Sequence, residues 1–149
     1  MTSPEISDSP QLKLMHSFIE GFKNRDLDQI AKLLHKDHRR ITYPRSLGKP
    51  EQTKEEYLQH SAELVKLWVD SDPIVHSIIE APGKVIAHLT SRANTSIGVQ
   101  MNREMILIAY AAPDDDGSLK LKQIEEFTDS QAYLDFFKAV TAAKANEVA

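Results

Sequence analysis

The segment Lys120–Ser130, KLKQIEEFTDS, decides the fold because it joins a strand directly to a capped helix. Asp129 is of a residue type that commonly caps helices, and the residues before it favour a strand. Successive strand residues point to opposite faces, so Glu126 shares a face with Ile124 and Glu125 does not. The face of Glu125 also carries Leu121, Gln123 and Phe127. Alternation alone leaves open which glutamate points inward, and a bulge would exchange the two.

Four predicted strands and a closing helix make up the C-terminal half. From Pro73 onward, apolar residues recur with a period of two, which is typical of strands. We place the strands near 73–81, 84–95, 101–112 and 119–127, separated by turns at APG, SIG and DDDGS. The closing helix has an apolar face that consists of Tyr133, Leu134, Phe136, Phe137 and Val140.

The N-terminal half is mainly helical. In residues 11–24, apolar residues at spacings of three and four predict an amphipathic helix. Asp26 is a candidate N-cap for a second helix, whose apolar stripe extends to Leu34. Thr53 followed by Glu56 is a capping-box signature for a third helix.

These elements predict one α+β domain. The segment 38–44, HRRITYP, favours a single strand among the helices. Segregated helices and strands indicate a strongly bent, mostly antiparallel sheet with helices over its concave face. Such a cone is a natural place for a small-molecule pocket. We expect a flexible tail over 1–10, the domain over 11–142 and a frayed tail over 143–149.

Composition excludes several function classes. The chain has 149 residues, a formal net charge of −4 and no cysteine, so disulfides, thiolate nucleophiles and zinc–sulfur sites are absent. No secretory signal is visible, and no apolar run approaches the roughly 18 residues of a membrane span. The only basic cluster, residues 35–40, is short. We therefore expect a cytoplasmic protein with neither a membrane nor a nucleic-acid partner.

The order of elements, with a strand that ends EF-T-DS before a helix, resembles the NTF2-like superfamily and, within it, the SnoaL-like polyketide cyclases. Residues 11–140 carry this resemblance. A narrower set is similar to small fungal isomerases and cyclases of meroterpenoid biosynthesis. That set consists of His38, Tyr43-Pro44, Ser46-Leu47-Gly48, Tyr57, His88, Thr95, Gly98, Asn102, Glu126-Phe127 and Asp129-Ser130.

The resemblance implies a cone-shaped mixed sheet whose last strand lies between the first strand and the 101–112 strand. It also implies a homodimer through the outer face of the sheet and no cofactor. In SnoaL-like proteins the acidic residue three before the capping aspartate often faces the cavity, and here that residue is Glu126. The superfamily contains enzymes, transport factors and inactive subunits, so the fold alone does not choose a function.

Glu126 is the first candidate catalytic residue. Burial in an apolar cone would raise the pKa of its carboxyl group, which suits a general acid or base near neutral pH. The alternative is a structural ion pair between Glu126 and Arg40 or Arg92.

Two histidines are further catalytic candidates. His88 shares a strand face with Ile86, Thr90 and Arg92, and His38 shares one with Arg40 and Thr42. A neutral imidazole paired with a glutamate could shuttle a proton. The alternative is a half-buried histidine that bonds a backbone carbonyl.

Aromatic and polar residues are candidates for substrate binding. Tyr43 and Tyr57 could donate to a developing enolate, or be core aromatics with one wet end. Asn102 could orient a substrate oxygen, and Arg92 is a further binding candidate. We expect Trp68 to be core or pocket wall. Arg103 is interpreted as part of a dimer-interface or strand-end salt bridge.

We expect no metal site. His35, Asp37 and His38 have near-ligand spacing but lack a distant third ligand. The DDDG sequence at 114–117 resembles a calcium loop, but Leu119 stands where the loop needs glycine.

The combined prediction is a cofactor-independent isomerase, cyclase or dehydratase that acts on a small apolar terpenoid or polyketide intermediate. Glu126 would act as base or acid, and the other candidates would shuttle protons or orient the substrate. The alternative is a non-catalytic ligand-binding or protein-interaction module. A cavity containing Glu126 and a histidine favours the enzyme, and a cone filled by Phe, Leu and Trp favours the module.

Overall fold

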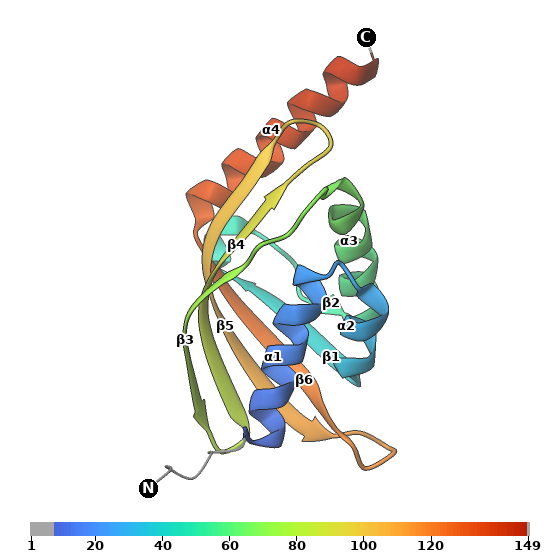
Figure 1. Ribbon diagram of the computed structural model, residues 1–149, viewed down its shortest axis with the longest axis vertical. Coiled ribbons are helices and arrows are strands. Elements are labelled where there is room, and N and C mark those ends of the chain that lie inside the picture. Colours follow the sequence, from blue (N-terminus) through green and yellow to red (C-terminus); the bar gives the residue numbers. More distant parts are fainter. Residues whose placement is uncertain (1–7, 149) are drawn as a thin grey trace, which may run out of the picture.

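A curved sheet organises the molecule, and its concave side carries the candidate site. The computed structural model describes residues 8–148. Figure 1 shows the long strands curving around α1, α2 and α3, with α4 extending past one end of the sheet. The helices are α1 (Pro10–Lys23), α2 (Leu27–Leu33), a 3₁₀ helix η1 (Arg45–Leu47), α3 (Lys54–Leu67) and α4 (Ser130–Val148). The strands are β1 (Leu34–Tyr43), β2 (Gln52–Thr53), β3 (Ile74–Ala81), β4 (Lys84–Asn94), β5 (Gln100–Pro113) and β6 (Leu119–Thr128).

The sheet is mixed and mostly antiparallel, as predicted. Its six strands follow the order β2-β1-β6-β5-β4-β3. Only the pairing of β1 with β6 is parallel among the strand pairs described. The last strand lies between β1 and β5, which confirms the topology that the resemblance implied.

Local sequence signals set the helix starts. The Asp26 side chain accepts a hydrogen bond from the Gln29 backbone at the start of α2. Thr53 and Glu56 form the predicted capping box of α3, and Asp129 accepts from the Ala132 backbone at the start of α4. These bonds satisfy backbone N–H groups that a first helical turn leaves without partners.

Several predicted boundaries are wrong. β1 begins at Leu34 rather than near residue 38, because Leu34 pairs with Leu121 of β6 and is fully buried. β2 and η1 lie in a segment for which no strand or helix was predicted. α1 begins at Pro10, and α4 continues to Val148. Residues 1–7 of the predicted N-terminal tail and residue 149 lie outside the described residues.

A bulge in β6 precedes the two glutamates. Tyr110 of β5 pairs with Gln123, whereas the next residue, Ala111, pairs with Leu121, so Lys122 is the extra residue. This shift lets Leu121 and Ile124 both be buried although they are three residues apart. From Ile124 onward the alternation is regular, and the bulge therefore does not exchange Glu125 and Glu126.

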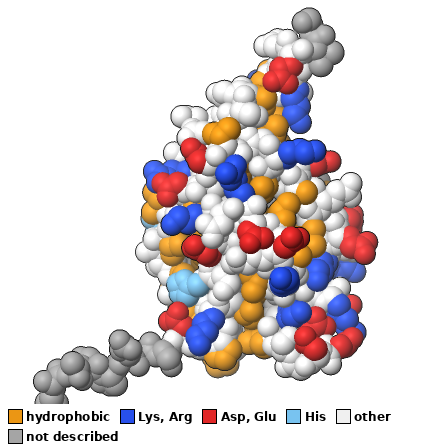
Figure 2. Space-filling view, turned by 45° about the vertical axis from the view of Figure 1, so that its right-hand side comes forward, with side chains coloured by type: hydrophobic (Ala, Val, Ile, Leu, Met, Phe, Trp, Pro, Cys, Tyr) orange, Lys and Arg blue, Asp and Glu red, His pale blue; other side chains and the backbone are white. Residues whose placement is uncertain are grey.

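Two apolar clusters form the core. The larger packs α1 and α2 against β4, β5 and β6, and the smaller surrounds Trp68 under α4. Figure 2 shows acidic and basic side chains interspersed over one face of the molecule. Within residues 8–148, no helix combines the length and the apolar character needed to cross a membrane.

Candidate functional site

A cavity of about 230 Å³ lies between the concave face of the sheet and the helices. Apolar side chains from both core clusters form much of its wall. They are Phe18, Ile19, Phe22, Leu64, Trp68, Leu89, Met101, Met105 and Leu107. Its polar and charged lining consists of Arg40, Thr42, Lys49, Gln52, Tyr57, His60, Ser61, Ser71, Ser91, Arg103, Glu126 and Tyr133. The predicted concave pocket therefore exists, and several titratable groups converge on it.

A buried ion pair forms the polar centre of this cavity. Thr42 and Glu126 are neighbours across the parallel β1–β6 pairing, which places Arg40 and Glu126 on the same face. The Arg40 guanidinium donates a hydrogen bond to Glu126 Oε1, and each residue is only 6% exposed. The same guanidinium lies 4.7 Å from the centroid of the Tyr57 ring. Glu126 thus faces the cavity, and of its two proposed ion-pair partners the structure shows Arg40.

The two arginines keep Glu126 ionised. Burial alone would raise the pKa of this carboxyl group, but the positive charges of Arg40 and Arg103 and the hydrogen bond from Arg40 lower it below its ordinary value. The raised pKa expected from the sequence is therefore wrong. A carboxylate at neutral pH can accept a proton from a bound molecule, so the resting site contains a candidate base.

Arg103 and His60 line the cavity but were not candidates from the sequence. Arg103 is buried on β5, and its guanidinium lies 5.1 Å from the centroid of the Tyr133 ring. The expected salt bridge at an interface or strand end is wrong, because Arg103 alternates with buried Met101 and Met105. The sequence shows that Arg103 shares a strand face with Met101 and Met105, but not that this face is interior.

His60 lies one helical turn from Tyr57 on α3 and also lines the cavity. Burial lowers the pKa of its imidazole, and the charges of Lys49 and Arg103 lower it further. His60 is therefore neutral at pH 7 and can both donate and accept a proton. Its spacing of three residues from Tyr57 is the sequence signal that could have identified it.

Unused hydrogen-bond donors accompany the charged groups. Among the described residues, Arg40 Nη1, Arg103 Nε and Trp68 Nε1 are buried and have no hydrogen-bond partner. All three residues line the cavity. Buried donors without partners are costly to the folded state.

His38 is buried but is not part of the cavity wall. Its Nδ1 lies 2.7 Å from the Leu121 carbonyl, which is the backbone-bonded alternative. Burial lowers the pKa of His38 to about 4 despite this bond, and the charge of Arg40 adds to the effect. The ring centroid is 6.0 Å from that of Tyr57, so His38 packs behind a cavity residue.

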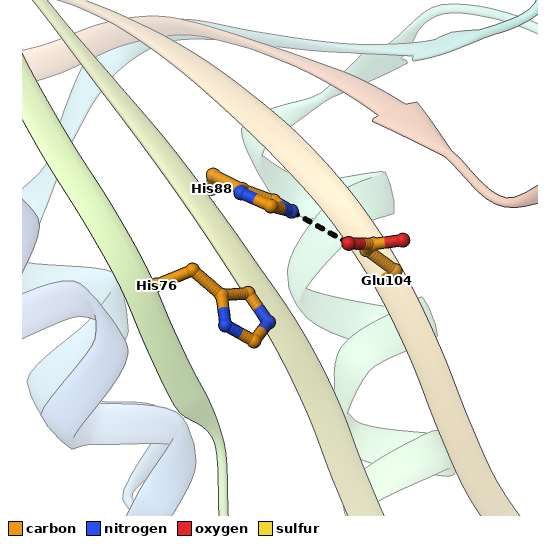
Figure 3. Close-up of side chains that lie close together, drawn as sticks. All are labelled: His76, His88 and Glu104. Carbon is orange, nitrogen blue, oxygen red and sulfur yellow. Dashed lines mark hydrogen bonds and ion pairs between the residues drawn. The ribbon is translucent and has the colours of Figure 1, made fainter.

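His88, Arg92 and Asn102 lie on the opposite, outer face of the sheet, so their predicted position in the cavity is wrong. The interior positions of β4 and β5 are instead those of Leu89, Ser91, Met101 and Arg103. Each of these lies one residue along the strand from a predicted site residue. His88 bonds Glu104, as Figure 3 shows, and Arg92 pairs with Asp72. Asn102 is exposed.

Of the predicted aromatic residues, Tyr57 and Trp68 line the cavity and Tyr43 does not. Tyr43 stacks on the exposed ring of Phe127, with centroids 6.3 Å apart and an interplanar angle of 15°. It therefore lies away from the cavity, contrary to prediction. Trp68 is pocket wall, as expected.

A bent mixed sheet with helices over its concave face and a cavity between them is an architecture that this chain shares with solved structures of fungal and bacterial proteins. Solved structures confirm the predicted resemblance at the level of fold. BvnE pinacolase from Penicillium brevicompactum superposes with a TM-score of 0.78 and 19% identity, over 95% of this chain and 97% of that protein. PrhC from Penicillium brasilianum NBRC 6234 gives 0.78 and 18%, over 91% of each chain.

A bacterial example is the putative SnoaL-like polyketide cyclase from Shewanella denitrificans OS-217. It has a TM-score of 0.68 and 10% identity, over 87% of this chain and 97% of that protein. By sequence comparison, no family model and no curated protein matches this chain.

Proposed function

We propose that the protein is a cofactor-independent isomerase, cyclase or dehydratase that removes a proton next to a carbonyl group of a small apolar molecule. The observation that carries this proposal is the buried Glu126 carboxylate, paired with Arg40 inside a largely apolar cavity. Glu126 retains its predicted role as the acid or base. His60, rather than His88, is the histidine of the proposed site.

The charges of the site suit formation of an enolate. Glu126 takes the C–H proton and becomes neutral, and the bonding electrons move to the carbonyl oxygen. Negative charge thus passes from Glu126 to the ligand while Arg40 and Arg103 stay positive. Proton transfer neutralises Glu126 and so ends its ion pair with Arg40. The Arg40 guanidinium can then stabilise the oxyanion. Return of the proton to another carbon gives an isomer, ring closure gives a cyclised product, and loss of a hydroxide gives dehydration.

His60 and Tyr57 complete the proposed site. A neutral His60 can pass a proton between the ligand and Glu126, and the Tyr57 phenol can donate to a ligand oxygen. General acid–base catalysis of this kind contributes about 10²–10⁴-fold to a rate. The apolar wall makes terpenoid or polyketide intermediates the proposed substrate class. BvnE is named a pinacolase and the Shewanella protein a putative polyketide cyclase, which supports that class by fold alone.

Isotope exchange tests the proposal without knowledge of the physiological substrate. A panel of cyclic terpenoid ketones and polyketide lactones is incubated with the protein in D₂O, and exchange of the C–H bonds next to each carbonyl is followed by NMR. We expect exchange with the wild type and a loss of at least about 100-fold in Glu126→Gln. Glu125→Gln is the matched control, because Glu125 lies on the other face of the same strand, and should keep full activity. Full exchange in Glu126→Gln would remove Glu126 from the mechanism.

The non-catalytic alternative is less well supported. A filled cone would favour a binding or interaction module, whereas Glu126 and His60 here line an open cavity. The homodimer and the cytoplasmic location stay predictions. Ile106 and Phe127 are paired on the outer face and 42% and 56% exposed, which favours a second copy on this face. Light scattering in solution would measure the oligomeric state.

A further inference from the structure

Three potential metal ligands converge on the outer face of the sheet, away from the cavity. His76 of β3, His88 of β4 and Glu104 of β5 place one ligand atom each within 4.8 Å of one another. Figure 3 shows the two imidazoles and the carboxylate gathered over neighbouring strands. His88 Nε2 lies 2.7 Å from Glu104 Oε2, and the imidazole centroids of His76 and His88 are 4.6 Å apart.

Strand register brings these residues together. Val75 pairs with Leu89 and Ser77 pairs with His88, so His76 is the extra residue of a bulge in β3. Bulges re-aim side chains, and here the His76 ring lies against β4, with Nε2 2.8 Å from the Thr90 hydroxyl. Thr90 is itself paired with Glu104 across β4 and β5, which completes the cluster.

We propose that His76, His88 and Glu104 bind one Zn²⁺ ion or a similar divalent transition metal. Two imidazole nitrogens and one carboxylate oxygen are borderline ligands that suit Zn²⁺ better than Mg²⁺ or Ca²⁺. Zinc bonds of about 2.0–2.2 Å to such ligands require ligand atoms roughly 3.4 Å apart. Ligand atoms already within 4.8 Å of one another reach that spacing by small side-chain rotations.

In the single chain, the position of the cluster is compatible with an ion entering from solvent. The His88 and Glu104 side chains are 39% and 60% exposed, and water can occupy the fourth coordination position. The ligands come from three neighbouring strands, of which β3 is the edge of the sheet. Bound metal would therefore tie the edge strand to β4 and β5 and stabilise the folded protein. The sequence predicted no metal site because the ligands are spread over residues 76–104.

Calorimetric titration of the full chain with ZnCl₂, combined with thermal unfolding, tests the site. We expect saturable binding of one Zn²⁺ per chain. Tm should rise with Zn²⁺ and return to its starting value after EDTA is added. MgCl₂ should give neither effect. His76→Ala and His88→Ala should each abolish saturable binding, and Glu104→Gln should weaken it.

His16→Ala is the matched control, because His16 is an exposed histidine on α1 outside the cluster. That variant should bind Zn²⁺ like the wild type. The proposal is overturned if the wild type shows no saturable binding, including the case in which a second copy covers this face. It is equally overturned if binding survives in both His76→Ala and His88→Ala.

Discussion

At the residue scale, the charge of the cavity depends on two arginines that hold one carboxylate. Burial raises the pKa of the Glu126 carboxyl group, whereas the positive charges of Arg40 and Arg103 lower it. The effect of the arginines on the Glu126 pKa exceeds that of burial, because both arginines lie in the same low-dielectric space, where opposite charges interact strongly. A buried pair of this kind is a poor source of stability, since desolvation offsets much of the attraction. Under the proposed function, its presence beside a cavity serves chemistry rather than folding.

Only the family resemblance allowed the sequence to predict that Glu126, and not Glu125, faces inward. Alternation defines two faces of a strand but does not say which is interior when both carry apolar residues. On β4 and β5, outer positions hold Ile86, Ile106 and Ile108, so polarity did not distinguish the faces. His88 and Asn102 were assigned to the wrong face for that reason. The lowered pKa of Glu126 depends on Arg40 first and on Arg103 second, and no local pattern places both arginines beside the carboxyl group.

A pH-dependent loss of stability is predicted from His38. Its folded-state pKa is about 4 against an ordinary 6.5, so the unfolded chain binds the proton first as the pH falls. Stability should therefore be complete above pH 6.5 and decrease toward pH 4. Between pH 7.5 and 5 the loss from His38 is about 2 kcal/mol. Glu126 acts in the same direction only below pH 4.5, since its pKa is lowered from that value.

Urea unfolding at several pH values measures this effect. His38→Gln keeps a donor for the Leu121 carbonyl but does not titrate, so its stability should change less between pH 7.5 and 5. Because His60 also has a lowered pKa, some dependence on pH should remain. His16→Gln, at an exposed position, should behave like the wild type. An unchanged pH profile in His38→Gln would assign the effect to other groups.

At the element scale, the sequence predicts the strands of the meander better than it predicts their irregularities. Turn residues and a period of two are local signals, and β3, β4, β5 and β6 lie within about two residues of their predicted ranges. The bulges in β3 and β6 depend on pairing with a neighbour, which a single strand does not encode. β1 was shortened in the prediction because Leu34 fitted the helical stripe, although burial against β6 determined its structure.

The contact between α1 and α2 yields a prediction about Gly21. A Cβ atom at this position would lie 2.7 Å from Ile30 Cγ1, closer than packed atoms allow. Gly21→Ala should gain up to about 1 kcal/mol in helix propensity. Overpacking should cost about 1–3 kcal/mol, so the variant should be destabilised overall.

A double-mutant cycle measured by urea unfolding separates these contributions. Ile30→Ala alone should cost about 2–5 kcal/mol because it leaves a cavity. The double variant should be more stable than the sum of the single effects, since alanine at 30 removes the atom that clashes. Lys13→Ala, at an exposed position of α1, is the control for propensity alone. Strict additivity in the cycle would show that the helices separate freely.

At the scale of the whole molecule, the sheet separates two surfaces with different chemistry. The concave face holds the Glu126 cavity, and the outer face holds His76, His88 and Glu104 (Figure 3). Element order and length were sufficient to predict a bent sheet under helices. They were not sufficient to predict an open cavity, because side-chain volumes from strands and helices far apart in sequence determine whether a cone is filled.

The open cavity itself can be tested by filling it. Leu64 of α3 lines the cavity, so Leu64→Trp should place an indole ring where a ligand would bind. We expect unfolding free energy within about 1.5 kcal/mol of wild type, because the added volume enters existing space. For a ketone that the wild type exchanges in D₂O, exchange should be lost. The ligand-induced stabilisation, about 2.7 kcal/mol at 100 times Kd, should be lost as well. Ala62→Trp, at an exposed position of the same helix, should retain both properties. If Leu64→Trp still binds and exchanges the ketone, the reaction takes place outside this cavity and Glu126 is not its base.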